Sequence, residues 1–235
     1  MINILITSPI QNVGKSTLAL LTTFALLDRK KSVHLIDADM GRYTIAERLG
    51  FKEMVKEEPG GKYYEVNNVN TLGYKFWFSY CDMSGAVVGK DEVDYCVIDF
   101  DVTRSAAHGD YYFPRADVLV IPQPPWTIDK NKDWTMRFLG GIQDQVKGRG
   151  VIIPTAMARQ YERKTDFEAI KWTNPEIYAA WKKYKVKATP VDGEAIEYNE
   201  DWEKYINFKP YGQKEVKQWI SRTEKPLLNL MFPQK

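Results

Sequence analysis

The chain has 235 residues, 44% of them hydrophobic, which is enough to bury one substantial core without requiring a second domain. It carries 33 basic and 31 acidic residues, so its net charge of +2 does not favour nucleic acid or an anionic membrane as its partner. Two cysteines and two histidines argue against a disulfide framework and a zinc cluster, and the lack of a basic leader or a long apolar run predicts a cytoplasmic protein without an integral membrane segment.

Short segments rich in β-branched or aromatic residues each precede a turn or a helical pattern. They span residues 2–7, 33–36, 74–80, 95–100, 118–121 and 151–154. Near-continuous apolar runs such as VLVI and CVID are typical of strands buried on both faces, as in parallel sheets. We therefore predict an α/β fold with a doubly wound, mainly parallel sheet, helices on both of its faces, and a single domain over residues 1–235.

Helical patterns separate several of these segments. Residues 15–29 place apolar side chains at helical spacing directly after a glycine turn. Residues 161–185, with a break at Asn174-Pro175, and residues 214–222 have helical patterns as well. Residues 55–72 are polar and rich in glycine and asparagine, which predicts a loop or a short hairpin.

The first turn carries the second half of a phosphate-binding motif. In the pattern G-x-x-x-x-G-K-[ST], backbone amides cradle phosphate oxygens, the lysine reaches the β- and γ-phosphates, and the hydroxyl binds Mg²⁺. Gly14, Lys15 and Ser16 match this pattern between a predicted strand and a helix whose N-terminus favours anions. Pro9 stands where the pattern begins with glycine. A Gly-Lys-Ser triplet also occurs at ordinary strand–helix turns, so the motif needs support from elsewhere in the chain.

Carboxylates at the ends of two other strands give that support. HLIDADMGR places Asp37 and Asp39 at the end of the second strand, and DYCVIDFD places Asp99 at the end of another. Open α/β sheets gather their ligands at the carboxyl ends of the strands. One aspartate can end a strand simply as a turn former, but three beside a phosphate loop suit a Mg²⁺–nucleotide complex, whose metal keeps a water shell held by carboxylates.

These motifs together resemble the ParA/MinD-type P-loop ATPases with a deviant Walker A motif, which partition plasmids and chromosomes or position cellular structures. QNVGKST resembles the phosphate loop of this family, LIDADMGR its switch segment and DYCVIDFD its Walker B strand. ADVLVIPQPPWTID, VIIPTAMARQYERKTDF and YGQKEVKQWI resemble later elements in the same order. The resemblance implies a slowly hydrolysing ATP switch that forms a nucleotide-dependent homodimer under the control of a partner protein.

The resemblance also implies a role for each matching residue. Lys15 and Asp39 are the catalytic residues, with Asp39 aligning the attacking water. Ser16, Asp37 and Asp99 hold Mg²⁺ or its water shell. The ATP-binding residues are Gln11, Asn12, Val13, Gly14, Lys15, Ser16, Thr17, Thr155 and Pro190, the last two beside the adenine. The choice of ATP over another nucleotide is implied by the family alone.

The front half of the loop departs from the family pattern. Where relatives carry a signature lysine that reaches the partner's phosphate across the dimer, this chain has Ile10, and Gln11 and Asn12 replace two glycines. Isoleucine supplies no cation, so stabilisation of the γ-phosphate must come from another residue or be absent. Three arginines on segments expected at the same sheet edge are candidates: Arg42, Arg104 and Arg159.

Three alternatives remain open at this stage. The loop also resembles that of dethiobiotin-synthetase-type enzymes, which act on a small acid, although no substrate pocket with its own basic residues is evident. A nucleotide-binding scaffold with little turnover is the second. The third concerns partners: the stretch from Trp181 to Lys187, WKKYKVK, interleaves aromatic and basic residues as non-specific DNA contacts would, and equally as a solvated helix face would.

Overall fold

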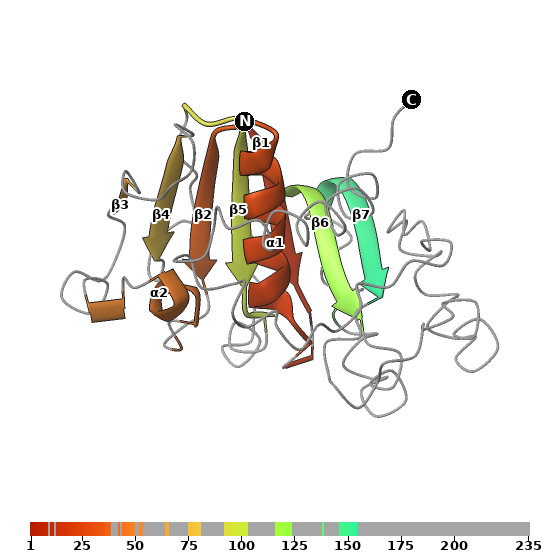
Figure 1. The fold of residues 1–235 in the computed structure, drawn as a ribbon. Helices are drawn as coiled ribbons and strands as arrows, with labels where there is room; N and C mark the ends of the chain where they lie inside the picture. Colours follow the sequence, from red (N-terminus) through yellow and green to blue (C-terminus); the bar gives the residue numbers. More distant parts are fainter. Residues whose placement is uncertain are drawn as a thin grey trace.

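The structure is a computed structural model of the chain. It describes residues 1–8, 10–11, 13–38, 42, 44–49, 52–53, 64–65, 75–80, 92–102, 116–123, 138 and 146–154. Within these residues the protein is built on one sheet, whose strands are β1 (Ile2–Thr7), β2 (Val33–Ala38), β3 (Tyr64–Glu65), β4 (Phe76–Tyr80), β5 (Tyr95–Phe100), β6 (Ala116–Gln123) and β7 (Val146–Pro154) (Figure 1). The described helices are α1 (Lys15–Asp28) and α2 (Thr44–Leu49).

The strand order is β3-β4-β2-β5-β1-β6-β7, with β1 near the centre of the sheet. β1 pairs in parallel with β5 on one side and with β6 on the other, and among the described strands only the short β3 runs antiparallel to its neighbour. The chain therefore builds the sheet outward in both directions from β1, which confirms the predicted doubly wound, mainly parallel sheet. Ligands of such sheets bind beyond the carboxyl ends of the strands, where the strand order reverses.

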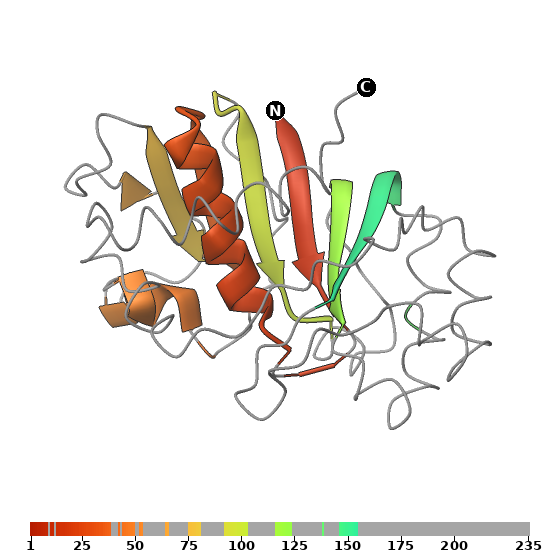
Figure 2. The same ribbon diagram turned by 45° about the vertical axis from the view of Figure 1, so that its right-hand side comes forward.

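The central strands form because their residues are almost continuously apolar and both faces are covered. Ile4, Leu5 and Ile6 of β1 are all fully buried, and every residue of β2 is buried. α1 packs against β1, β2 and β5, and Figure 2 shows it running across one face of the sheet. Phe24, midway along α1, is only 1% exposed, so the helix contributes a large aromatic side chain to the core.

A polar clip fixes the relative position of β2 and β5 at their amino ends. The backbone amide and the hydroxyl of Ser32 donate to Asp94 Oδ2 at 2.9 and 3.0 Å, and the Asp94 amide donates back to Ser32 Oγ at 2.8 Å. These hydrogen bonds hold the pKa of the Asp94 carboxyl below its usual value. Because the clip joins the residues just before both strands, it favours the register that places Asp37 beside Asp99 at the other end.

Most predicted elements coincide with observed ones. The segments 2–7 and 95–100 are β1 and β5 to the residue, and the predicted helix 15–29 is α1 shortened by one residue. The polar segment 55–72 contains the short strand β3, whose antiparallel partner β4 lies beyond the segment. The other residues of this segment lie outside the described residues, so the predicted loop or hairpin stays a prediction. The predicted helices 161–185 and 214–222 lie outside the described residues. The single domain over 1–235 stays a prediction.

Candidate functional site

The phosphate loop lies between β1 and α1, at the edge of the sheet where the parallel strands end (Figure 1). Gly14 is the N-cap residue of α1 and has φ 87°, in the left-handed region. A side chain at this position would cost about 1–2 kcal/mol, because Cβ would approach the following carbonyl oxygen. The Gly14 carbonyl then accepts from the Leu18 amide at 2.9 Å, the first hydrogen bond of α1. The glycine of the motif is thus required by the sharp turn from loop to helix.

The N-terminus of α1 is suited to an anion. Gly14 offers no side-chain cap, and the first turn of the helix holds no acidic residue. The first-turn amides of any α-helix lack partners inside the helix, and the helix dipole adds positive potential at the same point. Phosphate oxygens are the ligands that such an amide cluster binds in other proteins. Ser16 and Thr17 lie in this first turn, as the sequence predicted for nucleotide contacts.

Lys15 lies over the loop and does not extend into solvent. Its side chain is 8% exposed, and Nζ donates a long hydrogen bond of 3.5 Å to the carbonyl oxygen of Ile10. The ammonium group therefore lies close to the loop backbone. A cation held at a helix N-terminus adds to the attraction for phosphate, since both contribute positive potential there.

Ile10, which stands where the family resemblance implies a lysine, is buried. It is 8% exposed, its amide donates to Ser8 Oγ at 3.2 Å, and Val13 further along the loop is 1% exposed. The loop is therefore held to the body of the protein by two apolar side chains. The sequence identified Ile10 as a departure from the family pattern, and its burial shows that this position packs into its own chain.

Three aspartates approach the same edge from two neighbouring strands. Asp37 of β2 and Asp99 of β5 are register partners, both fully buried, and Asp99 is also aligned with Ile6 of β1. Asp101, directly after β5, is 1% exposed. The sequence reasoning assigned no role to Asp101, although the D-x-D spacing in DYCVIDFD could have drawn attention to it. Asp39 lies outside the described residues, as do Asn12, Thr155 and Pro190.

Asp37 has a clear structural task. Its Oδ2 accepts hydrogen bonds from the backbone amides of Ile45 and Ala46, both at 3.1 Å. These amides belong to the first turn of α2, where a carboxylate is favoured by both hydrogen bonding and the helix dipole. Asp37 therefore ties the start of α2 to the end of β2. Its assignment to the metal stays a prediction beside this observed contact.

The described side chains do not form a protein-only metal cage. No group of three or more His, Cys, Asp or Glu side chains within the described part of the chain is arranged to hold a metal ion. Mg²⁺ in nucleotide sites takes one or two protein ligands and completes its shell with water and phosphate. A hydroxyl in the first turn of α1 and a buried carboxylate at the end of β5 fit that mode, so Ser16 and Asp99 suit a metal that arrives with its nucleotide.

Two residues of reactive types, a cysteine and a histidine, are excluded as catalytic candidates by their burial. Burial raises the pKa of the Cys96 thiol to about 12, so it is not a nucleophile at neutral pH. The His34 ring is fully buried, with Nε2 2.8 Å from Ser79 Oγ on the adjacent β4. Both side chains belong to the interior of the sheet rather than to its carboxyl edge.

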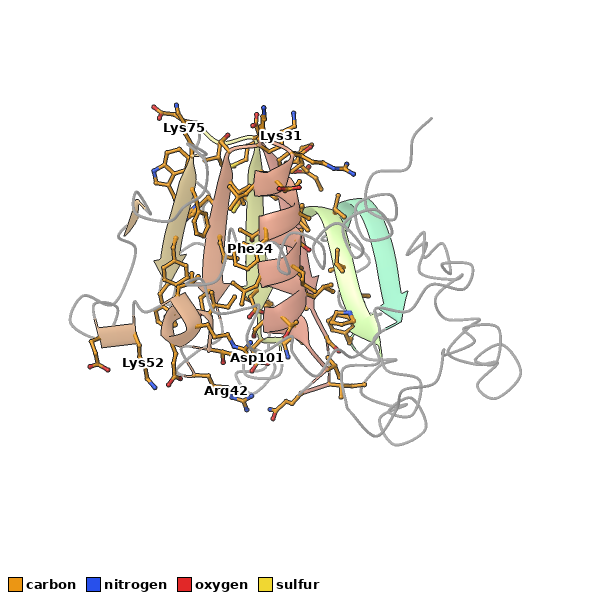
Figure 3. All side chains as sticks on the ribbon, viewed as in Figure 1. Phe24, Lys31, Arg42, Lys52, Lys75 and Asp101 are labelled. Carbon is orange, nitrogen blue, oxygen red and sulfur yellow. The ribbon has the colours of Figure 1, made fainter. Side chains whose placement is uncertain are left out.

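One of the three candidate arginines reaches the phosphate loop. Arg42, between β2 and α2, donates from Nη2 to Gln11 Oε1 at 3.1 Å. Figure 3 shows Arg42 and Asp101 at the carboxyl edge of the sheet, whereas Lys31 and Lys75 lie at the opposite edge. Arg104 and Arg159 are outside the described residues. The structure therefore brings Lys15, Arg42, Asp37 and Asp99 to one edge.

Comparison with known proteins gives matches among solved structures only. A scan against protein-family models and a search of curated proteins both find no match. Among solved structures, a chain of the MinC:MinD cell division protein complex of Aquifex aeolicus has a TM-score of 0.57 at 19% identity, over 100% of this chain and 98% of that one. The chain has the ParA/MinD fold.

Two further structures agree with this assignment. A plasmid partition protein of Borrelia burgdorferi B31 bound to AMPPNP has a TM-score of 0.55 at 18% identity, with 97% of each chain covered. A ParA family ATPase of Chlorobium tepidum has a TM-score of 0.53 at 12% identity, over 95% of this chain and 98% of that one. Coverage of nearly the whole of both chains means that the common fold extends beyond the phosphate loop. None of the described helices has the length and apolar character needed to cross a membrane.

Proposed function

We propose that this protein is a cytoplasmic ATP-binding and slowly hydrolysing switch of the ParA/MinD type, which forms a homodimer around its nucleotide. The observation that carries the proposal is the phosphate loop itself. Gly14 turns the chain into α1, Lys15 is held over the loop, and Asp99 ends the neighbouring strand at the same edge. The AMPPNP bound to the Borrelia burgdorferi relative supports a nucleotide as the ligand.

Each group has a definite task in this proposal. The first-turn amides and Lys15 bind the β- and γ-phosphates, and their positive charge stabilises the charge that develops as the terminal bond breaks. Ser16 and Asp99 hold Mg²⁺ or its water, and the metal when bound offsets phosphate charge. Asp39, two residues after Asp37, aligns the attacking water. Thr155 and Pro190 are assigned to the adenine.

The structural relatives support a proposal for the cargo and the partners. One structural relative was solved as a complex of MinC with MinD, and another is a plasmid partition protein. We propose that a regulatory partner protein controls the cycle and that the switch partitions or positions DNA or a cellular cargo. The stretch from Trp181 to Lys187 is the proposed site for non-specific DNA contacts.

Hydrolysis tests the proposal directly. Wild-type protein is expected to bind Mg²⁺–ATP and to release phosphate slowly, whereas Asp39→Ala should bind ATP and release phosphate at least ~100-fold more slowly, because a positioned catalytic side chain contributes about that much or more. Nucleotide binding by calorimetry and phosphate release by a coupled assay provide the measurement.

The controls separate this proposal from its alternatives. Phosphate release that requires an added carboxylic acid metabolite would instead favour a dethiobiotin-synthetase-type enzyme. Tight ATP binding with no phosphate release by the wild type would favour a scaffold. Failure of the wild type to bind any nucleotide would contradict the proposal altogether.

Dimerisation provides an independent expectation. Because Ile10 is buried in its own chain, any dimer must form without a cation reaching across from that position. We expect a dimer with Mg²⁺–ATP and a monomer with Mg²⁺–ADP, measured by light scattering coupled to size-exclusion chromatography. A monomer in both states would remove the dimeric part of the proposal and leave nucleotide binding intact.

A further inference from the structure

Arg42 brings a second positive charge to the phosphate loop from a separate element. It lies 31 positions from Gln11 in the sequence, and its Nη2 donates to Gln11 Oε1 at 3.1 Å. Gln11 directly follows Ile10, which stands in place of the family lysine. Lys15 Nζ donates to the carbonyl oxygen of Ile10. Two cationic groups therefore contact consecutive residues of one loop.

The position of Arg42 is set by the fold. Asp37 binds the first amides of α2 at Ile45 and Ala46, and α2 begins at Thr44, two residues after Arg42. Arg42 thus lies between two fixed points, the end of β2 at Ala38 and the start of α2 at Thr44. This restricts the arginine to the carboxyl edge, where Figure 3 shows it below the N-terminal end of α1.

The contact with Gln11 is of a kind that phosphate can displace. An amide oxygen is a neutral acceptor, whereas phosphate carries charge and accepts two parallel hydrogen bonds from a guanidinium. The side chain of Arg42 is exposed, so it can turn from Gln11 to a ligand without opening the core. The guanidinium offers five N–H donors, and the recorded bond uses Nη2 alone.

We propose that Arg42 contacts phosphate. Its guanidinium moves away from Gln11 and binds the terminal phosphates of a nucleotide bound to the same chain. It supplies from within the chain the second cation that Ile10 cannot provide. The inference rests on the proposed nucleotide binding and deepens it.

Charge and hydrogen bonding can be separated at this position. Arg42→Gln removes the charge but keeps an amide donor for Gln11, and Arg42→Lys keeps the charge. Arg29→Gln is the matched control, because Arg29 is exposed and lies at the opposite end of α1. ATP and ADP affinities are measured for each variant at low and high salt, together with the midpoint of thermal unfolding.

Arg42→Gln is expected to weaken ATP binding by about 10-fold and to reduce its salt dependence, the loss usual for one partly screened charged hydrogen bond. Arg42→Lys should stay within about threefold of the wild type, since a charge remains but the bidentate geometry is lost. Arg29→Gln should bind as the wild type does, and all three variants should keep the wild-type unfolding midpoint.

Two results would overturn the inference while nucleotide binding stands. One is wild-type affinity and salt dependence in Arg42→Gln, which would make Arg42 only a link to Gln11. The other is an equal loss in Arg42→Gln and Arg42→Lys, which would exclude a role for the charge. If the wild type itself binds neither nucleotide, the proposed function fails and this inference fails with it.

Discussion

Replacement of Lys15 by methionine is expected to weaken ATP binding by about 100-fold. Methionine keeps the apolar stem of the buried side chain and removes only the ammonium group, so the loop keeps its packing. A charged hydrogen bond contributes about 1.5–3 kcal/mol, and a group that is shielded from solvent is at the upper end of that range. Calorimetric titration with Mg²⁺–ATP measures the loss.

The control for Lys15→Met is Lys75→Met. Lys75 is exposed and lies at the amino edge of the sheet, so this variant has the same change in charge far from the loop (Figure 3). It should bind ATP as the wild type does. Equal affinity of Lys15→Met and wild type would contradict the assignment of the phosphate loop, since no other side chain of the motif contributes a positive charge.

The central part of the fold is predictable because its signals are local. The apolar runs of β1 and β5 and the helical spacing of α1 each lie within a few consecutive residues, and the structure reproduces them almost to the residue. Gly14 belongs to the same class, because the motif already implies a turn that only glycine adopts without strain. Asp37 and Asp99 could also be placed at one edge, since both end apolar strands of a parallel sheet.

The parts that sequence reasoning missed depend on contacts between distant residues. α2 is only six residues long, and its start is fixed by the side chain of Asp37, eight residues before Ile45. A helix of that length has no periodic pattern to detect, because its stability comes from its cap and its packing. Arg42 is likewise one of three candidate arginines in the sequence, because no local pattern distinguishes it from Arg104 and Arg159.

At Ile10 the chain lacks a charged side chain but has an apolar side chain that packs into the core. From the sequence, its only visible property is that it carries no charge. In the structure, Ile10 and Val13 anchor the loop by burial, which a long cationic side chain directed outward would not do. A prediction of this anchoring would have required knowledge of which core surface lies beneath the loop, and that surface is assembled from several strands.

Asp37→Ala is expected to lower the free energy of unfolding by about 3 kcal/mol. The amides of Ile45 and Ala46 are within fully buried residues, and alanine would leave both without their acceptor. Each buried donor that loses its partner costs about 1–3 kcal/mol, and the cavity left by the shorter side chain adds to the loss. Asp37→Asn keeps an acceptor oxygen, so its loss should be about 1 kcal/mol, mainly from the interaction of the charge with the helix dipole. Urea denaturation of both variants measures the difference.

The same two variants also test whether Asp37 positions Arg42. If the cap holds the segment after β2 in place, Asp37→Ala should show faster amide hydrogen exchange at Ile45 and Ala46 and weaker ATP binding than Asp37→Asn. Asp28→Ala is the matched control, because it removes an exposed carboxylate at the C-terminal end of α1 and should leave α2 protected. Wild-type exchange at both amides in Asp37→Ala would contradict the cap. In that case only the pairing of β2 with β5 would remain to position Arg42 beside the loop. Because β2 ends at Ala38, four residues before Arg42, this pairing alone does not determine where Arg42 lies.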